Sequence, residues 1–184
     1  MKISIHQPNF MPWYPFFKKI EEAEVFVILS QCQYEKGGFQ NRFNMNDRWY
    51  TMSVNRGMHN ISTKQYINEV KDWDNIKRKL PEYQKVLDEF DDCIQKSLMH
   101  TNIDIIKKIC SFLNIKTKIV YDKETDQKGT DRLLEICKLH NAETYIAGPS
   151  GRKYLDERKF LDNNIKVIYQ NQKEKDKVPI LKVL

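Results

Sequence analysis

Residues 2–29, KISIHQPNFMPWYPFFKKIEEAEVFVIL, decide the fold of this chain. A short stretch at residues 2–6 predicts a buried strand, which stops at a polar triplet that ends with Pro8. Hydrophobic residues at helical spacing then predict a helix over residues 15–23. The continuous run of β-branched and aromatic residues at 24–29 is typical of a parallel strand covered on both faces. Strand, helix and strand in this one stretch therefore indicate a βαβ unit.

The rest of the chain alternates between helix and strand after one interruption. A glycine turn at 37–38 and an alternating stretch at 48–54 predict a hairpin-like excursion after the second strand. Further elements are expected as helices at 73–80, from Pro81 to 94, from an Asn102 cap to 112, at 130–140 and at 153–161, and as strands at 117–121, 143–147 and 165–169.

This alternation predicts one α/β domain over residues 1–184. We expect a three-layer, Rossmann-like fold with a mostly parallel sheet and helices on both of its faces. The β-hairpin after the second strand is expected to leave this sheet as an excursion. The charged C-terminal tail, residues 172–184, is expected to be loosely held.

Composition limits the classes of partner. The net charge of +6 permits an anionic ligand, but basic residues are scattered among acids, so nucleic acid is not an expected partner. The four cysteines form no Cys-x-x-Cys pair and lie beside no histidine at ligand spacing, so no metal site is predicted. No apolar run approaches the ~20 residues of a membrane span. Reduced thiols in the cytoplasm are the expectation.

Three predicted strand ends carry polar, turn-rich sequence. They are the triplet starting at His6, residues 31–36 after the second strand, and residues 148–152. Because ligands of open parallel sheets bind beyond the carboxyl ends of strands, we expect all three to open onto one edge. His6 suits general acid or base chemistry near neutral pH. The alternative is a buried imidazole bonded to the backbone.

Several nearby residues offer groups that bind anions or aromatic ligands. Arg42 suits bidentate binding of phosphate or carboxylate, with Lys36 as a point charge, although a solvated loop is the alternative. Cys32 is a nucleophile if His6 lies close, and otherwise an inert thiol. The aromatic stretch 10–17 serves as a ligand platform or as core. The substrate-binding residues expected are Gln7, Trp13, Gln33, Tyr34, Lys36, Gln40, Asn41, Arg42, Ser150, Gly151 and Tyr154.

The octapeptide His6-Gln7-Pro8-Asn9-Phe10-Met11-Pro12-Trp13 resembles the opening of the WbqC-like family. Residues 17–20, 25–36, 39–42 and 145–154 are similar to later blocks of that family, so the resemblance covers most of the chain. It implies a role in making O-antigen or a similar bacterial surface glycan. Within that setting we expect a cytoplasmic enzyme that transfers an acyl or aminoacyl group to a nucleotide-linked amino sugar.

In this hypothesis His6 transfers the proton and the surrounding residues bind the substrate. Gln7, Gln33 and Asn41 would orient the acceptor, Lys36 and Arg42 would hold phosphates, and Ser150 with Gly151 would close the site as an anion nest through backbone N–H groups.

The resemblance is incomplete in two places. The family usually has acidic residues after the second strand, where this chain has Ser30-Gln31, and a longer C-terminal segment. These departures favour an alternative, a non-catalytic nucleotide-sugar-binding or scaffold protein that works as a homo-oligomer or with a pathway partner. A nucleotidyltransferase-like adenylating enzyme is a further alternative, but residues 10–13 lack the second histidine of such enzymes.

Overall fold

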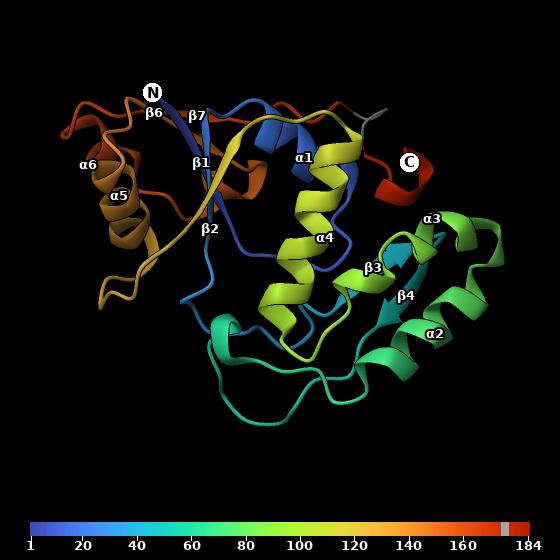
Figure 1. Ribbon diagram of the computed structural model, residues 1–184. Helices are drawn as coiled ribbons and strands as arrows, with labels where there is room; N and C mark the ends of the chain where they lie inside the picture. Colours follow the sequence, from blue (N-terminus) through green and yellow to red (C-terminus); the bar gives the residue numbers. More distant parts are fainter. Residues whose placement is uncertain (174–176) are drawn as a thin grey trace.

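The computed structural model describes residues 1–173 and 177–184 and contains one five-stranded parallel sheet (Figure 1). The strands lie in the order β5 (Lys118–Tyr121), β2 (Val25–Ile28), β1 (Lys2–His6), β6 (Thr144–Ala147) and β7 (Lys166–Tyr169). Numbered along the chain within this sheet, the order is 3-2-1-4-5, that of a doubly wound fold. The predicted βαβ unit and parallel sheet are confirmed.

Helices cover both faces of the sheet. The helices are α1 (Tyr14–Glu21), α2 (Glu69–Lys79), α3 (Gln84–Asp88), α4 (Leu98–Phe112), α5 (Gly129–Leu139) and α6 (Glu157–Leu161). In β2, Phe26 and Ile28 belong to the hydrophobic cluster that includes α1 and α4. Val25 and Val27 belong to the opposite cluster, with α5 and α6. Successive residues of β2 therefore face opposite layers, which is why the strand is apolar throughout.

The hairpin after the second strand forms as predicted. Strands β3 (Arg42–Met45) and β4 (Arg48–Thr51) pair antiparallel, and the two turn residues, Asn46 and Asp47, have φ values of 51° and 60°. Positive φ at both central positions is typical of the tight turns that suit twisted strands. The hairpin lies with α2 and α3 on the side of the molecule away from α5 and α6 (Figure 1).

Three helix predictions need correction. The helix expected from Pro81 is interrupted: α3 ends at Asp88, and the flanking turns Pro81–Tyr83 and Asp91–Cys93 are 3-10. Helix α4 begins at Leu98, capped by Ser97 rather than Asn102. The helix expected at 153–161 is shorter, because Pro149–Lys153 forms a 3-10 turn and α6 follows it.

Asn102 instead ties together segments that lie far apart in sequence. Its buried amide donates hydrogen bonds to the carbonyls of Pro8 at 2.8 Å and Gln40 at 2.7 Å. Its oxygen accepts a hydrogen bond from the Tyr66 hydroxyl at 3.0 Å. A polar side chain in the middle of a helix is tolerated here because each of its groups has a partner.

The C-terminal tail is held more firmly than expected, since Ile180 and Leu181 pack in the hydrophobic core. Ile180 and Leu181 are 1% and 3% exposed. The Tyr14 amide donates to the Val178 carbonyl at 2.9 Å. Burial of these apolar side chains holds a segment whose charged neighbours suggested solvation. Residues 174–176 of the expected loose tail lie outside the described residues.

Candidate functional site

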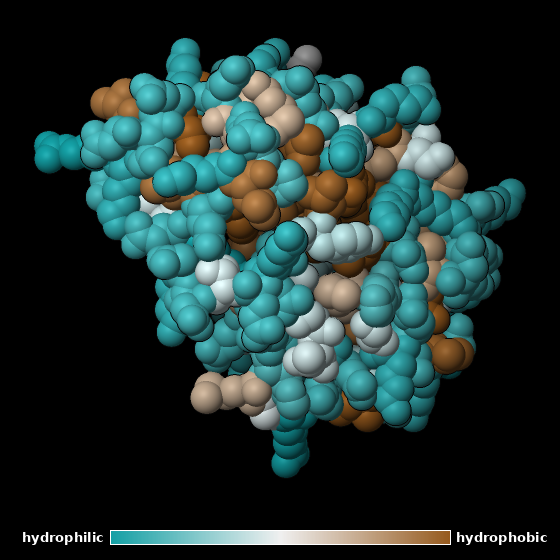
Figure 2. Space-filling view, turned by 60° about the vertical axis from the view of Figure 1, so that its left-hand side comes forward, coloured by the Kyte–Doolittle hydropathy of each residue, from teal (hydrophilic) through white to brown (hydrophobic). Residues whose placement is uncertain are grey.

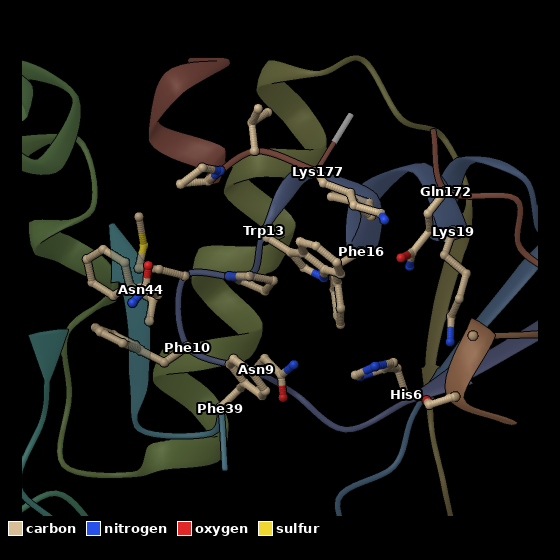
Figure 3. A pocket seen from close by; sticks show the side chains of 18 of the residues that line it. His6, Asn9, Phe10, Trp13, Phe16, Lys19, Phe39, Asn44, Gln172 and Lys177 are labelled. Atoms are coloured by element: carbon tan, nitrogen blue, oxygen red, sulfur yellow. The ribbon is translucent and has the colours of Figure 1, made fainter. Parts of the chain in front are cut away.

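A cavity of about 760 Å³ opens at the carboxyl edge of the sheet (Figure 3). It is lined by His6 at the end of β1, by residues 148–150 after β6, and by Gln170 after β7. Strands β1 and β6 are neighbours at which the winding direction of the sheet reverses. Ligands of doubly wound folds bind at this switch point, and the volume suits a small organic molecule.

Three aromatic side chains in the cavity wall are exposed to solvent. Trp13, Phe39 and Trp49 are 43%, 54% and 46% exposed. The rings of Phe39 and Trp49 lie 5.6 Å apart between centroids. The face of the molecule shown in Figure 2 is mostly hydrophilic, and apolar residues are visible in a hollow of that face. Exposed aromatic rings in a cavity provide flat apolar faces on which a sugar or a base can stack.

His6 presents an unprotonated ring nitrogen. Its Nδ1 lies 2.9 Å from the Gln7 carbonyl oxygen, which can only accept, so Nδ1 carries the proton and Nε2 keeps its lone pair. Burial, together with the positive charge of Lys19, lowers the pKa of His6 to about 3. The imidazole is therefore neutral at physiological pH, and its edge packs against Phe16.

Lys19 is a site residue that the sequence reasoning missed. It lies in α1, is only 3% exposed, and lines the cavity on the same side as His6 (Figure 3). Its ammonium donates to the Ile5 carbonyl at 2.9 Å, and burial lowers its pKa to about 7. The available signal was its position three residues after Phe16, which places it near the buried face of the helix.

Four of the expected binding residues hydrogen-bond within the protein instead of lining the cavity. Gln40 donates to the Gln7 amide oxygen at 2.5 Å. Asn41 accepts from the Tyr34 hydroxyl at 2.8 Å and donates to the Met52 carbonyl at 2.7 Å. These bonds hold the loop after β2 against the end of β1, so the amides shape the site from outside.

The two expected phosphate ligands also lie outside the cavity lining. Arg42 donates to both carbonyls of the glycine turn at 37–38, and its guanidinium lies 4.2 Å from the centre of the Trp49 ring. Lys36 is exposed in the loop, as is Gln33, whose amide contacts the Met58 sulfur at 3.5 Å. Arg42 therefore supports the turn and one aromatic wall of the cavity.

The segment after β6 contributes only part of what was expected. Ser150 lines the cavity. Gly151 is buried, its N–H donates to the Gly148 carbonyl at 2.9 Å, and an added Cβ would come within 2.9 Å of Leu155. The backbone N–H of Gly151 is therefore already hydrogen-bonded and does not form an anion nest. The residue is small because a larger side chain would not fit beside Leu155. Tyr154 is 59% exposed and does not line the cavity.

A buried carboxylate from another strand end contacts the turn after β2, the segment in which the resemblance led us to expect acidic residues. Asp122, which follows β5, accepts from the amides of Ser30 at 2.8 Å and Gln31 at 3.2 Å. Arg132 of α5 pairs with it at 2.5 Å, and the Asp122 side chain is fully buried. This pair holds the turn after β2 and has no direct access to the cavity.

Cys32 does not line the cavity either. Its sulfur accepts a hydrogen bond from the Gln7 amide at 3.3 Å, and burial raises the pKa of the thiol. The thiol therefore stays protonated near neutral pH, which favours the inert alternative over the nucleophile. All four cysteines are free.

Comparisons with known proteins place the chain in a family. A model of the WbqC-like protein family matches residues 7–179. The uncharacterized protein Rv1507c of Mycobacterium tuberculosis is 28% identical over 187 residues, covering 91% of this chain and 81% of that protein. No solved structure matches. Within the described part of the chain, no helix is long and apolar enough to cross a membrane. The chain belongs to the WbqC-like protein family, which is linked to polysaccharide biosynthesis in general.

Proposed function

We propose that this protein is a cytoplasmic transferase that acylates a nucleotide-linked amino sugar during synthesis of an O-antigen-type surface polysaccharide. The observation that carries the proposal is the cavity at the β1–β6 switch point, which combines exposed aromatic rings with an unprotonated histidine nitrogen. Sugars and bases stack on such rings, and polar groups placed among them fix orientation. The family's link to polysaccharide synthesis supports the choice of substrate class.

His6 can act directly on the acceptor amine. Amide formation joins the amine nitrogen to the acyl carbon, releases the donor's leaving group with its electron pair, and passes one proton from the nitrogen to that leaving group. The Nε2 lone pair of His6 accepts a hydrogen bond from that N–H group, which orients the nitrogen toward the acyl carbon. Trp13 and Ser150 line the same cavity and contribute a stacking face and a hydroxyl.

One observation favours the alternative of a non-catalytic nucleotide-sugar-binding protein. A pKa of about 3 for His6 lies far from the neutral range in which a general base works best. A binding protein needs His6 only as a hydrogen-bond acceptor. The two functions therefore differ in whether His6 affects turnover or only affinity.

Replacing His6 with alanine separates these functions. For a transferase we expect turnover to fall about 100-fold, because the amine would lose the acceptor that orients it toward the acyl carbon, while substrate affinity changes little. The measurement is mass-spectrometric detection of the N-acylated nucleotide sugar, using panels of acyl and aminoacyl donors. Lys36→Ala, in the exposed loop outside the cavity, is the control and should keep the wild-type rate. Equal rates for wild type and His6→Ala would remove His6 from the reaction.

A further inference from the structure

Lys19 is a buried cation without a carboxylate partner. Its side chain is only 3% exposed, and its one hydrogen-bond acceptor among the described residues is the Ile5 carbonyl. An ammonium group has three N–H donors. In residues 1–173 and 177–184 no carboxylate oxygen lies within 4.0 Å of the Lys19 nitrogen. The acidic group that acts on it electrostatically is Glu22, which is exposed on the same helix.

An arrangement of this kind is unfavourable for the folded protein alone. Lysine is almost never fully buried unless it is paired, because removing an ammonium from water is costly. The neighbouring His6 ring is neutral and cannot supply the missing negative charge. Lys19 nevertheless lines an open cavity of about 760 Å³, from which a ligand can approach it.

We propose that Lys19 binds an oxyanion group of the ligand, a carboxylate or a phosphate, at the inner wall of the cavity, and that this binding takes up a proton. The inference rests on the proposed function in taking the same cavity as the ligand site. It assigns the ligand's charge to Lys19 in place of Lys36 and Arg42, which lie outside the cavity lining.

Proton uptake follows from the surroundings of Lys19. Because burial lowers the pKa of Lys19 to about 7, the amine is mostly neutral in the free protein at pH 8. An anion in contact favours the charged form and raises the pKa by about 1–3 units. The other ionisable groups around it are His6 on β1, Glu22 on α1, and Lys177, which also lines the cavity. Affinity should therefore be constant well below pH 7, fall by up to about tenfold per pH unit between pH 7 and the raised pKa, and level off above that pKa.

The test is an NMR titration of the lysine Cε signals in the full chain, labelled with ¹³C-lysine, between pH 6 and 10. The Lys19 signal is assigned by its absence in Lys19→Met, and Lys18, partly exposed on the same helix, serves as an internal reference. Inorganic pyrophosphate and acetate are added in separate titrations. We expect a midpoint near pH 7 in the free protein, raised by at least one unit by one of the two anions.

The anion that produces the shift identifies the chemistry: pyrophosphate points to the nucleotide part of the substrate and acetate to an acyl or aminoacyl carboxylate. A midpoint near 10.5 in the free protein, or no shift with either anion, overturns the inference. Calorimetry provides a second readout, since Lys19→Met should weaken binding of the active anion at least tenfold and Lys18→Met should not. A Lys19 shift without acyl transfer would leave the inference standing and contradict the proposed function; acyl transfer with an unresponsive Lys19 would do the reverse.

Discussion

Replacing Lys19 with methionine is expected to raise the free energy of unfolding at pH 7 by about 2–5 kcal/mol. Methionine has a similar length and can occupy the same buried position, but it removes a buried charge. The lost hydrogen bond to Ile5 offsets about 1 kcal/mol of the gain. Greater stability on removal of a residue is the expected sign that the residue is kept for function.

The same variant should change how stability depends on pH. The folded-state pKa of Lys19, about 7, lies below its ordinary value of 10.5, so the unfolded chain holds more protons between these values. The contribution of Lys19 to stability therefore rises from pH 7 toward pH 10. Urea unfolding measures this effect: between pH 7 and pH 9 the free energy of unfolding should increase less in Lys19→Met than in wild type. Lys18→Met should behave like wild type, and a Lys19→Met protein that is less stable at pH 7 would show that the lysine is structural.

Replacing Asp122 with alanine is expected to lower the free energy of unfolding by about 3–5 kcal/mol. The substitution leaves Arg132 buried without its carboxylate and deprives the amides of Ser30 and Gln31 of their acceptor. Denaturant unfolding measures the loss. Asp92→Ala removes an ion pair with Lys108 at the surface, where pairs contribute little, and should unfold close to wild type. A similarly small loss in Asp122→Ala would mean that Arg132 reaches solvent without it.

The sheet could be predicted because its strands must satisfy burial on both faces. The run at 25–28 has no polar position, which excludes a surface strand, and its place after a short helix implies a parallel neighbour. The errors concern features whose partners lie far away in sequence. Asn102 suggested a helix cap because its bonds to Pro8 and Gln40 cannot be deduced from local sequence. The tail was predicted to be loose because of its charged stretch at 173–177. The apolar residues that pack, Ile180 and Leu181, come after that stretch.

The candidate site was predicted in position more accurately than in detail. His6 and Ser150 line the cavity because strand ends of a parallel sheet meet at one edge, and Trp13 lines it from the start of α1. Gln40 and Asn41 were expected to bind substrate, but Gln40 donates to the Gln7 side chain and Asn41 bonds to the Tyr34 hydroxyl and the Met52 carbonyl. Lys19 escaped notice because a charged residue on an amphipathic helix is usually solvated, and only the packing of α1 reveals that it is buried.

The central claim is that the cavity at the β1–β6 switch point binds the ligand, and Gly148 offers a direct way to block it. Gly148 lines the cavity with φ −69° and ψ 161°, a conformation open to any residue, and an added Cβ meets no atom within 4 Å. Gly148→Phe should therefore place a ring in part of the cavity without backbone strain, while Gly148→Ala is the matched control.

The measurement is the melting temperature of wild type and both variants with a panel of nucleotide-linked amino sugars. A ligand that binds only the folded state raises the melting temperature by mass action. We expect one of these compounds to raise the melting temperature of wild type and of Gly148→Ala but not that of Gly148→Phe. An equal rise in Gly148→Phe, or no rise with any compound in wild type, would contradict it.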